Sequence, residues 1–140
     1  MTTVVYTQGV MASDSSCWED DTHAHPVRKI WRVHKCLVGC AGLFADINAF
    51  VQWVKAGADE DDYPKLKSLS SIVVQPSGKV LAYEEAGPLP IEVQGAYCAI
   101  GSGAAVALGA LHQGATAVQA VRAARAHDKG TKGRIVSVKL

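Results

Sequence analysis

The residue of this 140-residue chain whose type and position best suit chemistry is Thr2, which directly follows Met1. A small second residue permits methionine removal, and the freed α-amine would then lie beside the hydroxyl of the same threonine. Because an α-amine has a reference pKa of about 8, one residue would supply both a nucleophile and a base. By itself the pattern is weak, since an inert, exposed N-terminus explains Met-Thr equally well.

Two charged residues, Asp14 and Lys29, accompany segments that predict β-strands. Asp14 ends the predicted strand 9–14 and Lys29 begins the predicted strand 29–33, both beside apolar runs. Two interpretations follow from the residues. The pair is either an ordinary surface salt bridge or a carboxylate that keeps an ammonium charged and directed at a nucleophile.

Other patterns that carry chemistry are weak. His23 and His25 near a cysteine suggest zinc, but their spacing does not suit a helical pair and no fourth ligand is evident, so we expect no metal and no cofactor. The cysteines form no CxxC pair and are expected to be free thiols. The four cysteines are Cys17, Cys36, Cys40 and Cys98.

The composition predicts a soluble globular protein, with 49% hydrophobic residues, 19% charged residues and a net charge of +1. Lys and Arg are scattered among acidic residues, so we expect no nucleic-acid partner. No apolar run approaches the roughly 18 residues of a membrane span, and a signal-peptide pattern is absent, which predicts a cytoplasmic protein without membrane contact. We expect one domain, residues 1–140.

Hydrophobic periodicity predicts an α+β fold in which antiparallel sheets carry helices on their outer faces, rather than a doubly wound parallel sheet. A polar loop is expected at 15–26, and a turn at 76–79. The predicted strands are 3–6, 9–14, 29–33, 35–41, 70–75, 80–84, 97–100 and 134–139, and the predicted helices are 45–55, 104–112 and 116–126.

Several short motifs occur in a characteristic order along the chain. They are Thr2-Thr3-Val4-Val5, Ala12-Ser13-Asp14-Ser15, Arg28-Lys29-Ile30, Gly39-Cys40-Ala41-Gly42 with Ala45-Asp46, Ala99-Ile100-Gly101-Ser102-Gly103, and more loosely Asp128-Lys129-Gly130-Thr131-Lys132-Gly133. In this order the chain resembles, over nearly its full length, proteasome β-type subunits and the bacterial proteasome-like peptidase HslV. The resemblance implies the N-terminal nucleophile (Ntn) hydrolase fold, a four-layer αββα sandwich. One helical layer is expected to be reduced, because only residues 56–68 separate the first helix from the next strand.

The resemblance also implies a role for each matched residue. Thr2 would be the nucleophile, and Lys29, held by Asp14, would lower the pKa of the Thr2 amine and stabilise the developing alkoxide. Gly42 would offer its backbone N–H to the oxyanion, although an ordinary turn glycine fits as well. If the N–H is what matters, Gly42→Ala should be tolerated better than Gly42→Pro.

Three further matched residues, Ser102, Asp128 and Thr131, would surround and orient the α-amine. From the residues alone, Ser102 fits a helix N-cap equally well, and Asp128 fits a helix end. Cys17, Cys40 and Phe44 would line a pocket that favours small apolar side chains, but core packing explains these three equally well. The residues expected to take part in catalysis are Thr2, Asp14, Lys29, Gly42, Ser102, Asp128 and Thr131, and those expected to bind substrate are Cys17, Cys40 and Phe44.

The implied function is a threonine endopeptidase that becomes active once Met1 is removed. It would cut peptides or unfolded proteins inside a homo-oligomer built of rings, and a separate ATPase is a candidate partner. Two alternatives stay open: an Ntn hydrolase that cleaves small amides, and a catalytically silent scaffold that keeps the fold.

Overall fold

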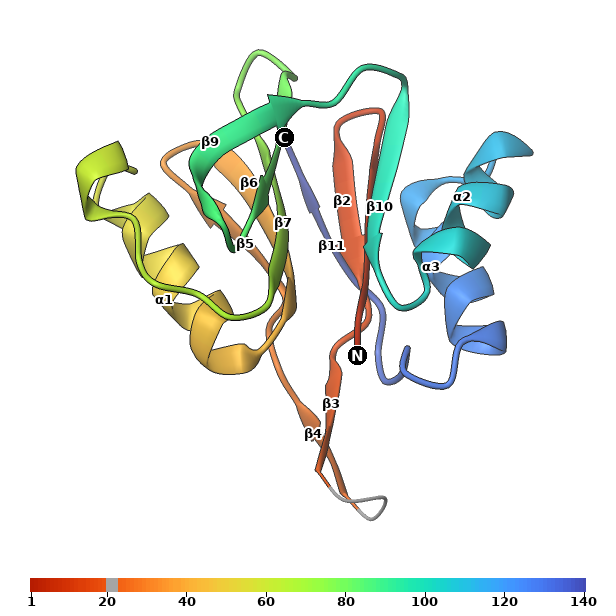
Figure 1. Ribbon diagram of the computed structural model, residues 1–140. Coiled ribbons are helices and arrows are strands. Elements are labelled where there is room, and N and C mark those ends of the chain that lie inside the picture. The colour runs from red at the N-terminus through yellow and green to blue at the C-terminus, as the bar shows by residue number, and fades with distance from the viewer. Residues whose placement is uncertain (20–22) are drawn as a thin grey trace.

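Four layers make up the fold, which is known from a computed structural model (Figure 1). The structure describes the backbone of residues 1–19 and 23–140, and the side chains of residues 1–17 and 25–140. Helix α1 (Phe44–Lys55) covers the outer face of one sheet, while α2 (Ala104–His112) and α3 (Ala117–His127) cover the outer face of the other. The predicted αββα sandwich of antiparallel sheets is therefore confirmed.

Both sheets are antiparallel throughout. The five-stranded sheet has the order β5-β6-β7-β8-β9, and the four-stranded sheet has the order β10-β1-β2-β11. The first comprises β5 (Ile30–Val33), β6 (Cys36–Gly42), β7 (Leu69–Val74), β8 (Val80–Glu84) and β9 (Gly87–Glu92). The second comprises β10 (Tyr97–Gly101), β1 (Thr3–Thr7), β2 (Val10–Ser13) and β11 (Val136–Lys139).

Three apolar layers hold the sandwich together. The layer between the sheets contains Val4, Met11 and Leu37, each with no exposed surface. One outer layer joins α1 to the five-stranded sheet around Phe50, and the other joins α2 and α3 to the four-stranded sheet around Val121. Because strand side chains alternate between faces, each sheet can contribute to two of these layers at once.

The helical layer beside α1 is reduced, as expected from the short segment 56–68. That segment contains only the 3₁₀ turn η1 (Glu60–Asp62) before β7 begins. It nevertheless adds Tyr63, whose ring stands edge-on to Trp53 with centroids 4.8 Å apart. Phe50 lies 5.5 Å from Trp53 by the same measure, so an aromatic cluster closes this side of the sheet.

Two predictions about the elements were wrong. Residues 15–26, expected as a loop, contain the hairpin of β3 (Ser16–Glu19) and β4 (His23–Pro26), which projects from the sandwich (Figure 1). Strand β9 was missed because Pro88 and Pro90 argue against a strand. It lies at the edge of its sheet, the position where proline is tolerated because no ladder bond is lost on the open side.

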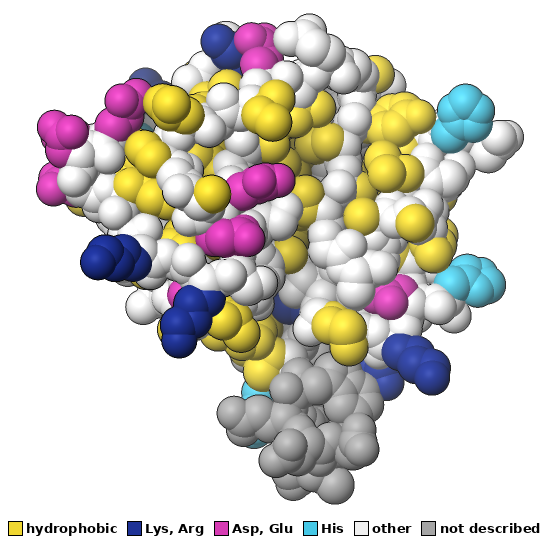
Figure 2. Space-filling model, in the orientation of Figure 1, with side chains coloured by type: hydrophobic (Ala, Val, Ile, Leu, Met, Phe, Trp, Pro, Cys, Tyr) yellow, Lys and Arg dark blue, Asp and Glu magenta, His cyan; other side chains and the backbone are white. Residues whose placement is uncertain are grey.

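Charged side chains on the visible face are interspersed around apolar ones, without one large patch of a single sign (Figure 2). Within the described residues, no helix has the length and apolar character needed to cross a membrane.

Candidate active site

Thr2 lies immediately before β1 and is 4% exposed. Along β1, Val4 and Tyr6 face the layer between the sheets, whereas Val5 faces α2 and α3. If this alternation continues to Thr2, one residue before the start of β1, the Thr2 side chain faces the layer between the sheets.

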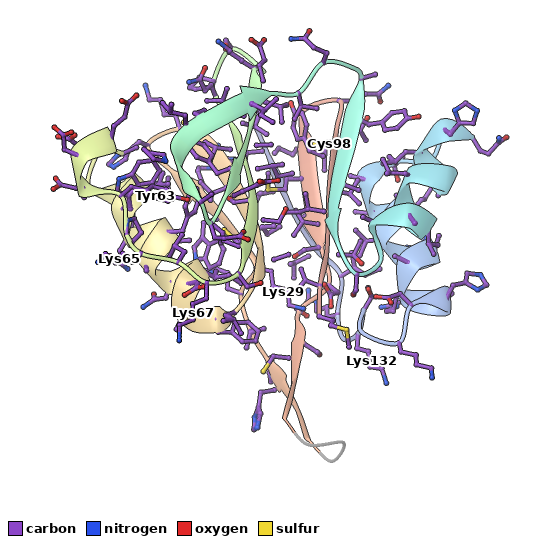
Figure 3. The ribbon with its side chains drawn as sticks, viewed as in Figure 1. Lys29, Tyr63, Lys65, Lys67, Cys98 and Lys132 are labelled. Carbon is purple, nitrogen blue, oxygen red and sulfur yellow. The ribbon has the colours of Figure 1, made fainter. Side chains whose placement is uncertain are left out.

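Lys29, which precedes β5 of one sheet, and Asp14, which follows β2 of the other, form a fully buried ion pair. Figure 3 shows Lys29 between the two sheets. The N–O distance of the ion pair is 2.9 Å, and each side chain is 0% exposed. The ammonium donates two further hydrogen bonds, to the Ser16 carbonyl at 2.7 Å and to the Met1 carbonyl at 2.9 Å. All three ammonium protons therefore have acceptors, and the surface salt bridge considered from the sequence is excluded.

Burial and the charge of Asp14 shift the pKa of Lys29 in opposite directions. Burial lowers the pKa of the Lys29 ammonium below the ordinary lysine value, and the Asp14 carboxylate opposes that shift. The carboxylate is held in place by two backbone donors, the N–H of Thr3 at 3.0 Å and that of Lys132 at 3.0 Å. Asp14 thus fixes the direction of the ammonium as well as supplying its counter-charge.

A second cluster lies at the ends of the helices that cover the four-stranded sheet. Asp128 accepts hydrogen bonds from the hydroxyls of Ser102 at 2.7 Å and Thr131 at 2.6 Å. The Ser102 hydroxyl oxygen also lies 3.4 Å from the Thr2 carbonyl oxygen, a longer contact than the bond to Asp128 that takes its single proton. The Ser102 contact joins two positions that are 100 residues apart in the chain.

The geometry bears on the alternatives for Ser102 and Asp128. The N-cap of α2 is Gly103, so Ser102 is not the helix cap. Asp128 is the C-cap of α3, and its carboxylate also accepts hydrogen bonds from the two hydroxyls. Partial burial alone would raise the pKa of Asp128, but the bonds from Thr131 and Ser102 outweigh it and hold that pKa below the ordinary value.

Gly42 ends β6 at the same end of the sheet as Lys29, whose carbonyl accepts the N–H of Cys40 at 3.0 Å. Its φ of +131° is unfavourable for residues with a side chain. A Cβ at this position would also lie 2.2 Å from the Ser68 carbonyl oxygen. An alanine at residue 42 would therefore strain this turn. That alanine is tolerated better than proline here stays a prediction.

Asp46, which was singled out only as part of a motif, supports the turn at Gly42. Its carboxylate accepts the N–H groups of Lys67 and Ser68, both at 2.7 Å, and the Ser68 carbonyl in turn accepts the N–H of Leu43 at 3.1 Å. Sequence reasoning missed this role because the partners are backbone groups, which leave no signal in residue types.

The three residues expected to line a substrate pocket lie in different environments. Cys17 is half-buried on β3, close enough to Lys29 to act on it electrostatically. Phe44 begins α1 and is 42% exposed. Cys40 is 0% exposed within the α1 core layer, where burial raises the pKa of its thiol to about 12. Only Cys17 and Phe44 thus have exposed surface that a substrate could contact.

Metal ligands do not gather in the part of the chain that the structure describes, where no three His, Cys, Asp or Glu side chains converge. The side chain of His23, considered above with His25, lies outside the described residues. All four cysteines are free thiols.

Hydrogen bonds thus connect five predicted site residues to the N-terminal segment 1–3, either directly or through one another, and Gly42 lies at the same end of its sheet as Lys29. The six residues form two groups that differ in construction. We call Asp14, Lys29 and Gly42 the strand-end half of the site, because each lies at or next to the end of a strand. Ser102, Asp128 and Thr131 form the helix-end half, in the loops before α2 and after α3.

Comparison with known proteins links this arrangement to one fold. No protein-family model and no curated protein matches the sequence. Among solved structures, Thiobacillus denitrificans BPH in complex with epoxomicin is similar with a TM-score of 0.70 and 16% identity, over 99% of this chain and 97% of that one. HslV from Trypanosoma brucei is similar with a TM-score of 0.66 and 18% identity, over 99% of both chains. The chain therefore has the fold of the HslV-like, proteasome-type Ntn hydrolases.

Proposed function

We propose that the chain is a threonine-type peptidase in which Thr2, once Met1 has been removed, is the nucleophile. One observation carries the proposal: the buried Lys29 ammonium lies 2.9 Å from the Met1 carbonyl, the group bonded directly to the Thr2 nitrogen. Removal of Met1 would free that nitrogen as an amine and release one Lys29 donor. The released donor is then available to the Thr2 hydroxyl.

In the proposed reaction, groups of this chain act on the substrate and on one water molecule. The Thr2 α-amine takes the proton from the Thr2 hydroxyl, whose oxygen attacks the substrate carbonyl carbon. The oxyanion that forms accepts a hydrogen bond from the Gly42 N–H, while the Lys29 ammonium stabilises the negative charge that develops on the Thr2 oxygen. Collapse returns the proton to the leaving amine and leaves an ester on Thr2, which water hydrolyses with the same amine as base.

The helix-end half has a separate part in this scheme. Asp128 and the hydroxyls of Ser102 and Thr131 would accept hydrogen bonds from, and orient, the free α-amine. The nearby N-terminal ammonium already contributes to the low pKa of Asp128. Substrates are proposed to be peptides or unfolded proteins, cut in a cytoplasmic homo-oligomer, with an ATPase as a candidate separate partner.

The test is covalent labelling of Thr2 by an epoxyketone that reacts with N-terminal threonines. Mass spectrometry first establishes whether the purified chain begins at Thr2. We expect one adduct per chain, on Thr2, in protein without Met1, and none in Thr2→Ala or in protein that retains Met1. Absence of an adduct on protein that begins at Thr2 would refute the peptidase and leave the silent scaffold.

A second measurement separates the two enzymatic possibilities. Protein with a free Thr2 is assayed against casein, short fluorogenic peptides and small acyl amides. The proposal expects cleavage of peptides, whereas turnover restricted to small amides would make the chain a non-proteolytic Ntn amidohydrolase.

A further inference from the structure

Thr3, the neighbour of the proposed nucleophile, is bonded to both halves of the site. Its backbone N–H donates to Asp14 Oδ1 at 3.0 Å, and its hydroxyl lies 2.6 Å from the hydroxyl of Thr131. Thr3 and Thr131 are both 0% exposed, so no solvent competes for these bonds. Thr3 therefore links the carboxylate that directs Lys29 to the loop that carries Asp128.

The direction of the hydroxyl bonds follows from a count of protons. Thr131 donates its single hydroxyl proton to Asp128 at 2.6 Å. In the 2.6 Å contact between the two threonines, Thr131 must therefore be the acceptor and Thr3 the donor. The result is a directed chain from Thr3 through Thr131 to the carboxylate, in which each bond polarises and strengthens the next.

The space around this hydroxyl pair depends on Gly103. A Cβ at that position would lie 2.0 Å from Thr3 Oγ1 and 2.8 Å from Thr131 Oγ1. Any side chain at residue 103 would therefore displace the two hydroxyls. A glycine at the N-cap of α2 leaves room for the contact between the strand and the loop.

We infer that Thr3 is a positioning residue, which holds Thr2 in register between Lys29 and Asp128. This inference rests on the proposed function. The side chain of Thr3 points away from the layer that holds Lys29, so it acts through Asp14 and Thr131 and touches no reacting atom. Both its bonds fix the backbone that carries the Thr2 amine and hydroxyl, the two groups between which the proton must move.

The test compares labelling of Thr2 in wild-type and variant proteins that begin at Thr2. Thr3→Val keeps the shape and removes the donor, and we expect the labelling rate at saturating epoxyketone to fall about tenfold. The concentration for half-saturation should stay within about twofold, because Thr3 makes no contact with the inhibitor. Thr3→Ser retains the hydroxyl and should restore the maximal rate.

Thr7→Val is the matched control on the same strand. Thr7 is 8% exposed, and its hydroxyl donates to the Ala96 carbonyl at 3.3 Å, far along β1 from Thr2. Its variant should lose thermal stability as Thr3→Val does, but label at the wild-type maximal rate. A merely structural role for Thr3 would make the two variants label alike.

Gly103→Ala provides a second route to the same contact if Thr3→Val does not fold, and it should slow labelling in the same way. The inference is overturned if Thr3→Val labels at the wild-type maximal rate, if Thr7→Val slows it equally, or if Gly103→Ala labels normally. Wild-type protein that begins at Thr2 and forms no adduct would instead refute the proposed function, before any variant is compared.

Discussion

In the strand-end half of the site, the charged side chains are completely enclosed: Asp14 and Lys29 are both 0% exposed and are fixed by the ends of paired strands. In the helix-end half, Asp128 is only half-buried and its partner Ser102 is exposed. A buried charge without its partner is costly, whereas water can replace a lost partner near the surface. Substitutions of Asp14 or Lys29 should therefore impair folding and chemistry together, and those of Ser102 or Asp128 mainly chemistry.

Lys29→Met should have the largest effect of any change in either half. It would leave the Asp14 carboxylate buried without a counter-charge, at a cost of about 3–5 kcal/mol in the free energy of unfolding. Because the proposed chemistry needs the ammonium, labelling of Thr2 should also fall below detection. Urea denaturation and epoxyketone labelling measure the two effects.

Lys79→Met is the matched control for that prediction. Lys79 forms a surface ion pair with Glu92 at 3.5 Å, with side chains 46% and 47% exposed. Its loss should change the free energy of unfolding by at most about 1 kcal/mol and leave labelling unchanged. Equal destabilisation by the two lysine variants would contradict the contrast between a buried and an exposed charge.

Gly42→Ala should have the second-largest effect. It should slow the labelling of Thr2 strongly while it lowers the Tm only moderately. The added Cβ meets the Ser68 carbonyl oxygen at 2.2 Å, so the turn that presents the Gly42 N–H must move. Loss of one oxyanion donor typically costs about 3 kcal/mol of transition-state stabilisation, a rate decrease of about two orders of magnitude. The labelling rate and the Tm of the variant are the quantities to compare.

Gly57 offers a control for the strain of a positive φ. Its φ is +109°, and a Cβ there would have no neighbour within 4 Å. Gly57→Ala should therefore lower the Tm through backbone strain alone and label at the wild-type rate. If both glycine variants label normally, Gly42 does not supply the oxyanion donor.

The two halves also differ in how far the sequence could predict them. Thr2, Asp14 and Lys29 were identifiable because each starts or ends an apolar strand in a recognisable order. The sequence did not reveal the carbonyl of Ser16 as an acceptor for Lys29, because backbone groups are present at every residue. The hydroxyl of Thr3 was equally hidden, since its partner Thr131 is 128 positions away and only the folded chain brings them together.

The same physical reasons explain the errors in the fold. Strong alternation or apolar runs predicted the buried strands of both sheets. Two elements were missed, the paired strands β3 and β4 and the proline-containing edge strand β9. These segments are strands because each pairs with a neighbouring strand, and the local sequence does not indicate that pairing. Gly42 was identified, but the strain that an alanine would cause there depends on Ser68, which only the tertiary structure places beside it.

Ser102→Ala should have a moderate effect confined to chemistry. It removes one of the two hydroxyl donors to Asp128 and the contact with the Thr2 carbonyl. We expect labelling to slow about tenfold with a small change in Tm, because the site of the lost bond is exposed to water. Ser137→Ala, at an exposed serine of β11, is the control and should leave both values unchanged. A large drop in Tm for Ser102→Ala would show that the helix-end half supports the fold as well.

The smallest expected effect is the response of stability to acid that Asp128 contributes. Its hydrogen bonds lower the pKa of the folded form below the ordinary value of 3.8, so the unfolded chain takes up this proton first as the pH falls. The contribution of Asp128 is therefore complete above about pH 4 and is lost as the pH falls through the lower, folded-state pKa. Asp128→Asn has no such proton, so the difference in urea midpoint between wild type and variant should narrow from pH 5 to pH 2. Ser102→Ala, which removes one donor, should show an intermediate narrowing. A difference that stays constant or widens in acid would mean that the two hydroxyls do not stabilise the Asp128 carboxylate. The contrast between the strand-end half, held by a buried ion pair, and the helix-end half, held by hydroxyl groups, would then be wrong for the helix-end half.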